Sequence, residues 1–80
     1  KSTQHATEQM RQRRISRSEV KFVLGSGVTI PERTRFELEY ETPSLAVEGR
    51  TWEGRMLRIA VVVEDRLIVV TVVDLGNRKG

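Results

Sequence analysis

The chain of 80 residues contains no cysteine and a single histidine, His5. The absence of cysteine excludes a disulfide scaffold, thiol catalysis and thiolate sites for zinc or iron–sulfur clusters. One histidine is too few for a multi-histidine metal site. The longest apolar run, residues 59–63, is far too short to cross a bilayer, and no secretory segment opens the sequence. We therefore expect no metal, no cofactor and no membrane contact.

The chain has room for one small domain, which we place over residues 1–80, with residues 76–80 as a frayed tail. Hydrophobic residues make up 38% and charged residues 31%, which is typical of a folded globular protein. The first residue is Lys1 and not methionine, which we interpret as an excised fragment or the tail of a longer polypeptide. We expect the domain to act in the cytoplasm, or in the cytoplasm of a target cell if it belongs to a secreted effector.

Charge is divided unevenly along the chain. Residues 1–35 carry eight cations and three anions, whereas residues 36–80 carry six cations and eight anions. Eleven of the fourteen cations are arginine, whose planar guanidinium matches the geometry of phosphate. This distribution predicts a polyanionic partner such as RNA or DNA. The alternative is that the arginines only solvate the outer surface of a helix.

The first third of the chain has the pattern of two short helices. Residues 4–14 contain no proline or glycine, and a serine and a threonine precede them as candidate N-caps. Ser16 and Glu19 have the spacing of a capping box, in which each side chain bonds the other residue's amide. We expect the second helix to run from this box to Gly25 as a left-handed C-cap.

From Val28 onward the pattern changes to the alternation of β-strands. Phe36–Glu41 alternates apolar and acidic residues, which predicts a strand with one buried face, and Thr42–Pro43 is expected to turn the chain. The expected strands comprise residues 36–41, 45–47, 56–64 and 66–75. The sequence thus predicts an α+β fold, ααββββ, in which both helices pack on one face of a four-stranded antiparallel sheet.

The last two strands allow a prediction of register. A two-residue turn at Glu64–Asp65 would place Val63 opposite Arg66, and Arg58 opposite Thr71. One face of the hairpin would then be wholly aliphatic and receive the helices: Leu57, Ile59, Val61, Val63, Ile68, Val70 and Val72. The other face would be half apolar, and a small domain seldom leaves such a face bare, so we expect a partner or substrate to cover part of it.

Several short motifs also resemble a known group of proteins. They are His5-Ala6, Gln9-Met10, Arg13–Ser16, Gly54–Arg58 and Val70–Val72. Their order is similar to that in a widespread family of small bacterial domains of unassigned function, which is itself considered similar to RelE-type toxins and barnase-like ribonucleases. The resemblance implies a RelE-like fold. Gln9 and Arg14 depart from the family, whose members usually carry arginine and glycine there.

The resemblance implies RNA cleavage without a metal, which requires a base for the 2′-hydroxyl, an acid for the leaving oxygen and cations for the phosphate. Histidine can both accept and donate a proton near neutral pH, so His5 is the candidate acid or base. Arg13 and Arg58 are the candidate phosphate ligands. The alternatives are a structural or solvated role for His5, and an ion pair between Arg58 and Glu48 or Glu39.

Further side chains are candidates for binding RNA without taking part in cleavage. They are Arg11, Arg14, Arg17, Trp52, Arg55 and Thr71. Trp52 would stack on a base, although loop tryptophans more often cap the end of a core.

The leading hypothesis is a small endoribonuclease toxin that cleaves RNA by 2′-hydroxyl attack and is neutralised by an antitoxin or immunity protein. Two alternatives stay open. One is a nucleic-acid- or protein-binding module without activity, and the other is a homodimer formed through the half-apolar sheet face.

Overall fold

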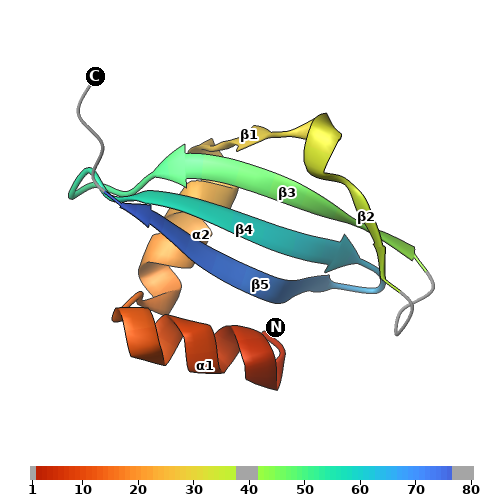
Figure 1. The fold of residues 1–80 in the computed structure, drawn as a ribbon, viewed down its shortest axis with the longest axis horizontal. Coiled ribbons are helices and arrows are strands. Elements are labelled where there is room, and N and C mark those ends of the chain that lie inside the picture. The colour runs from red at the N-terminus through yellow and green to blue at the C-terminus, as the bar shows by residue number, and fades with distance from the viewer. Residues whose placement is uncertain (1, 38–41, 77–80) are drawn as a thin grey trace.

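The computed structural model describes residues 2–37 and 42–76. Two helices precede a sheet of antiparallel strands, so the predicted α+β class is confirmed (Figure 1). Within the described residues the sheet has five strands, not the four predicted, because Val28–Thr29 forms an additional short strand before the first predicted one. The elements are α1 (Gln4–Arg13), α2 (Arg17–Ser26), β1 (Val28–Thr29), the 3-10 turn η1 (Pro31–Arg33), β2 (Arg35–Glu37), β3 (Thr42–Arg50), β4 (Met56–Val63) and β5 (Leu67–Gly76).

Side chains cap both helices at their N-termini. The Thr3 hydroxyl accepts a hydrogen bond from the Ala6 amide at 3.1 Å. The predicted capping box of α2 is confirmed: the Ser16 hydroxyl accepts from the Glu19 amide at 3.1 Å, and the Ser16 amide donates to the Glu19 carboxylate at 2.8 Å. These bonds satisfy amides that the helices leave without a partner.

The predicted end of α2 at Gly25 is wrong. The helix continues to Ser26, and Gly27 follows it with extended backbone. Gly27 is needed where α2 leads into the sheet, because a Cβ there would lie 2.6 Å from the carbonyl oxygen of Glu48. The glycine is therefore required by close packing of two backbones and not by a left-handed conformation.

The strands follow the order β1-β3-β4-β5, and β2 pairs with the same edge of β3 as β1 does. The predicted turn at Thr42–Pro43 is wrong, because both residues belong to β3 and pair with Glu37 and Phe36. Phe36 is exposed, although the alternation of apolar and acidic residues predicts that it is buried. Alternation shows which residues share one side of a strand, but it does not show whether another element covers that side. The rest of the predicted strand, residues 38–41, lies outside the described residues, as do residues 77–80 of the predicted tail.

The predicted register of the β4–β5 hairpin is also wrong. Val63 pairs with Leu67, so three residues separate the strands. Two β-bulges interrupt the pairing farther along. At the first, Val61 pairs with Val69 while Ala60 pairs with Thr71, so Val70 has no opposite residue. The second lies between Met56 and Leu57. Each bulge adds a residue to β5 and moves the later pairs along. As a result Arg58 lies opposite Val73 and not opposite Thr71.

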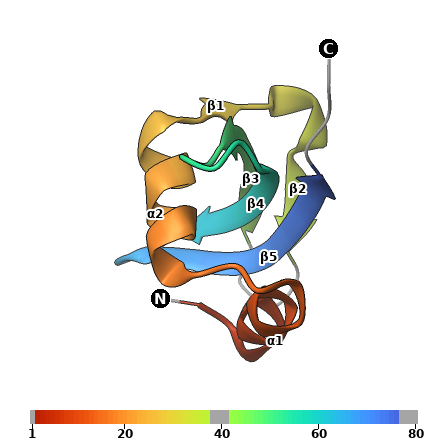
Figure 2. The ribbon, with the colours of Figure 1, turned by 90° about the vertical axis from the view of Figure 1, so that its left-hand side faces the viewer.

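The two helices pack over different strands on the face of the sheet that carries the core. α2 covers β3 and β4, whereas α1 lies along β5, the edge strand (Figures 1 and 2). Both still contribute to one core, which comprises Ala6, Met10, Ile15, Val20, Val23, Leu57, Ile59, Val61, Val69 and Val72. Two residues differ from the predicted aliphatic face. Val63 is exposed. Val69 belongs to the core where Val70 was expected, because the bulge at Val70 changes which residues of β5 point toward the helices.

α1 also satisfies part of the free edge of β5. The Thr3 amide donates to the Val69 carbonyl at 2.9 Å. The Gln9 side-chain oxygen accepts from the Val72 amide at 2.8 Å. Covering an edge in this way removes a template for aggregation. None of the helices in the described part of the chain is long and apolar enough to span a bilayer.

Candidate nucleic-acid interface

A groove lies on the face of the sheet opposite α2. Figure 2 shows α2 on one side of β3 and β4, and β2 on the other. The groove has a volume of about 480 Å³ and runs between η1–β2 and the outward residues of β3, β4 and β5. Its lining comprises Glu32, Arg33, Thr34, Arg35, Ser44, Ala46, Arg58, Ala60, Thr71 and Val73. Among the described residues, three arginines and one carboxylate thus face a space floored by small side chains.

Local sequence explains why arginines border this groove. Pro31 begins η1, where its fixed φ suits the first turn. The turn ends before Thr34, and the chain then pairs with β3 from Arg35 onward. Arg33 and Arg35 therefore stand over the sheet on an exposed wall. The buried Ser44 and Ala46 beneath them are too small to fill the space.

Arg58 is held in this groove by an ion pair across the strands. Glu48 on β3 is its direct neighbour, and the Arg58 Nε donates to Glu48 Oε2 at 2.7 Å. The two side chains are 25% and 19% exposed, so water screens the pair only in part. The contact uses Nε alone, which leaves both terminal guanidinium nitrogens without a bond in the described structure. Arg58 can therefore keep its carboxylate and still donate to a phosphate.

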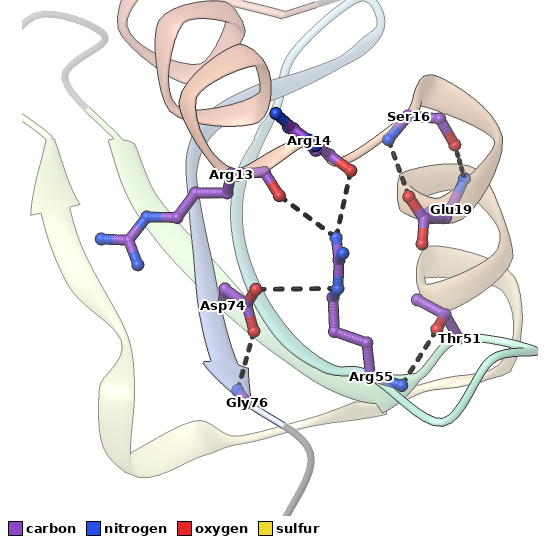
Figure 3. Close-up of polar contacts among 8 residues, drawn as sticks. All are labelled: Arg13, Arg14, Ser16, Glu19, Thr51, Arg55, Asp74 and Gly76. Atoms are coloured by element: carbon purple, nitrogen blue, oxygen red, sulfur yellow. Dashed lines mark hydrogen bonds and ion pairs between the residues drawn. The ribbon is translucent and has the colours of Figure 1, made fainter.

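Thr71 lines the same groove as Arg58, although the two are not cross-strand neighbours. His5 and Arg13 belong to α1, along the outer edge of β5, and do not line the groove. His5 is exposed and lies one helical turn before Gln9, which touches that edge. Figure 3 shows the Arg13 guanidinium pointing away from α2. The structure thus brings Arg58 and Thr71 together and sets His5 and Arg13 beyond β5.

Arg55 makes contacts within the chain at the end of α1, although its side chain is 28% exposed (Figure 3). Its Nη1 donates to the carbonyls of Arg13 and Arg14 at 3.4 and 3.2 Å, and its Nε lies 3.7 Å from Asp74 Oδ2. The guanidinium therefore satisfies carbonyls that the helix leaves open at its C-terminus. Arg14 itself is exposed and adopts a left-handed conformation with φ 56°.

The remaining candidates are spread over the helix side of the molecule. Arg11 is exposed and pairs with Glu8 at 2.6 Å. Arg17 begins α2 and borders a different cleft, between the helices. Trp52 is exposed in the β3–β4 loop and meets Phe22 of α2 edge to face, with ring centroids 5.5 Å apart. Both rings are exposed and neither belongs to the core, so this is a surface contact, and the capping alternative for Trp52 stays a prediction.

The sequence reasoning did not select Arg33 and Arg35, and it considered Glu48 only as an alternative ion-pair partner. The available signal was local: a proline that opens a turn, followed within four residues by two arginines. Within residues 2–37 and 42–76, no group of three acidic, histidine or cysteine side chains is placed to hold a metal ion.

The chain matches none of the curated proteins and none of the solved structures with which it was compared. Residues 2–74 match a family described as a domain of unknown function, DUF4258. An unassigned family agrees with the resemblance noted in the sequence, while its likeness to RelE-type toxins stays a prediction. Because the match spans nearly the whole chain, the protein belongs to the DUF4258 family.

Proposed function

We propose that the domain binds single-stranded RNA in the groove and cleaves it without a metal, as a toxin-type endoribonuclease. The observation that supports this most is the convergence of Arg33, Arg35 and Arg58 on one open groove. Guanidinium groups bind phosphate through paired hydrogen bonds, and the hydroxyls of Thr34 and Thr71 add donors for sugar or phosphate oxygens.

The proposed reaction is attack of a ribose 2′-oxygen on the adjacent phosphorus. The 2′-hydroxyl loses its proton to a base, the bond from phosphorus to the 5′-oxygen breaks, and that oxygen takes up a proton. The products are a 2′,3′-cyclic phosphate and a 5′-hydroxyl. Arg58 would neutralise the phosphate, and an RNA strand crossing β5 beside Thr71 would reach His5 as acid or base and Arg13 as a second cation.

A binding module without activity is the second candidate, and two observations favour it. Glu48 already neutralises part of the charge of Arg58, and β5 separates β4 from the helix that carries His5. RNA binding requires only the arginines of the groove, whereas cleavage requires one RNA strand to reach from the groove to His5 on α1.

The two candidates are separated by measuring binding and cleavage on one fluorescent RNA oligonucleotide in the presence of EDTA. We expect Arg35→Ala and Arg58→Ala to weaken binding about tenfold each, since each removes a charge-assisted hydrogen bond. Arg66→Ala, in the exposed β4–β5 turn, is the matched control and should leave affinity unchanged.

Cleavage is followed by mass spectrometry of the products. We expect wild-type protein to form cyclic-phosphate ends and His5→Ala to bind RNA equally well without forming them. Binding without cleavage by the wild-type protein would leave only the binding module. If the groove variants bind like the control, the RNA site is elsewhere and the proposal is wrong.

Neutralisation by an acidic antitoxin or immunity protein belongs to the same proposal, with the arginine-lined groove as the surface to be covered. The alternative of a homodimer through this face has less apolar surface to use than the sequence indicates. Val62 and Ala46 point to this side of the sheet and are already buried within the chain.

A further inference from the structure

The sheet extends beyond both helices on the face that α2 covers (Figure 1). Three aliphatic side chains lie on this extension: Leu45, Val63 and Leu67 are 39%, 57% and 40% exposed. Leu45 pairs with the core residue Val61, and Val63 pairs with Leu67, so all of them share the face of the core. No helix among the described residues covers this end of the core face, where Leu45, Val63 and Leu67 are partly exposed, and we call it the uncovered face.

A cleft beside α2 joins this uncovered face. It has a volume of about 420 Å³, and its apolar lining comprises Met10, Val20, Leu24, Leu67 and Val69. Leu67 belongs both to the cleft and to the uncovered face, so the two form one surface. Adjacent apolar exposure of this kind marks interaction sites on soluble proteins.

The charges around this surface are arranged unevenly. Arg17 and Lys21, one helical turn apart on α2, border the cleft, and neither takes part in an ion pair among the described residues. Glu64 and Asp65 lie at the far end, in the exposed β4–β5 turn. The flank along α2 is therefore positive and without internal neutralisation.

We propose that this surface docks an amphipathic α-helix of a partner protein, with an apolar stripe on the uncovered face and acidic residues beside Arg17 and Lys21. A helix is about 10 Å wide and would continue the layer that α2 begins. A second copy of this chain fits less well, because a dimer that set the two α2 helices side by side would bring the same cations together.

This surface lies on the opposite side of the sheet from the arginine-lined groove. A partner helix therefore leaves the groove open, and the inference does not depend on the proposed function. RNA and the partner helix are expected to bind together without competition.

The test uses two designed 18-residue helical peptides with the same leucine stripe at positions i, i+3, i+4 and i+7. One peptide carries glutamate on its polar face and the other carries lysine. We expect fluorescence anisotropy to show the acidic peptide binding at least about tenfold more tightly than the basic one, because two favourable charge pairs replace two repulsive ones. Leu67→Ser and Lys21→Glu should each weaken the acidic peptide at least about fivefold.

Arg33→Glu is the matched control, since it makes the same charge change on the opposite side of the sheet and should leave peptide affinity nearly unchanged. Thermal melting of each variant verifies that it is folded. Equal binding of the two peptides, no binding of either, or equal losses for Lys21→Glu and Arg33→Glu would overturn the proposal. So would sedimentation of the protein alone as a dimer that Leu67→Ser dissociates.

Discussion

At the scale of single residues, Arg14 adopts a backbone conformation that residues other than glycine seldom adopt. It ends α1 with φ 56° and ψ 46°, a left-handed conformation that brings the Cβ of an L-residue too close to its carbonyl. Glycine is the usual residue there because it has no Cβ. The conformation persists because the Arg14 amide donates to carbonyls of α1, and its own carbonyl accepts from Arg55 at 3.2 Å.

We predict that Arg14→Gly stabilises the domain by about 0.5–1 kcal/mol, since it relieves this strain while the carbonyl contact stays. The measurement is the free energy of unfolding in urea. Arg14→Ala is the control, because alanine keeps the Cβ and should give no gain. A loss of stability on Arg14→Gly would mean that the arginine side chain itself holds the end of α1.

The Glu48–Arg58 pair links stability to binding at one residue. Glu48→Gln removes a partly buried charge pair, and we predict a loss of about 1 kcal/mol in the free energy of unfolding. The same change removes a carboxylate beside the groove and releases Arg58, so RNA affinity should rise. Opposite signs in urea unfolding and RNA anisotropy support this account, whereas a fall in both would show that Glu48 positions Arg58 for phosphate.

Among the elements, α1 is defined by the edge it covers. Its apolar stripe consists of little more than Ala6 and Met10, which is too narrow to hold a ten-residue helix on its own. Two hydrogen bonds with β5 hold the helix further: the Thr3 amide donates to the Val69 carbonyl, and the Gln9 side-chain oxygen accepts from the Val72 amide. Gln9, which departs from the arginine of the family resemblance, thus has a structural role in this chain.

We predict that Gln9→Ala lowers the free energy of unfolding by about 1 kcal/mol, because the Val72 amide loses its acceptor. Hydrogen exchange at Val72 should become faster than at its neighbours. Gln9→Glu keeps an acceptor oxygen and is the control, with most of the protection retained. Unchanged exchange at Val72 in Gln9→Ala would show that α1 is held by its apolar contacts alone.

For the whole molecule, the two faces of the sheet differ in character. One carries the helices, the core and an uncovered apolar extension, and the other carries the arginine-lined groove. The excess of arginine in the first half of the chain thus reaches the groove through Arg33 and Arg35, while Arg17 lies on the other face. Positive charge therefore lies on both faces, where it serves the proposed RNA on one side and the proposed partner helix on the other.

If the three groove arginines each neutralise one phosphate, the logarithm of RNA affinity should fall with the logarithm of salt with a slope of about −2. Affinity should then drop about twentyfold between 50 and 200 mM salt. Titrations of an RNA oligonucleotide at four salt concentrations measure the slope, and Arg35→Ala should reduce its size by about one third. A slope near zero would contradict phosphate binding.

Much of the fold follows from sequence because its signals are local. The Ser16–Glu19 box, the proline-free helices and the valine-rich strands each act within a few residues, and all are found in the structure. The predicted turn at Thr42–Pro43 failed because β2 pairs with those residues, and that pairing depends on a segment several residues away.

Of the candidate site, the sequence selected Arg58 and its Glu48 alternative, since a charge within an apolar strand demands a partner. It selected Thr71 through a predicted register that is wrong, although Thr71 lines the same groove. It did not select Arg33 and Arg35, which become neighbours of Arg58 only when η1 folds over the sheet. Register, the edge position of α1 and the groove were decided by tertiary structure. Each of them depends on which segments distant in the sequence pair with each other and on where a β-bulge interrupts the pairing. Many weak contacts spread over the whole chain determine both.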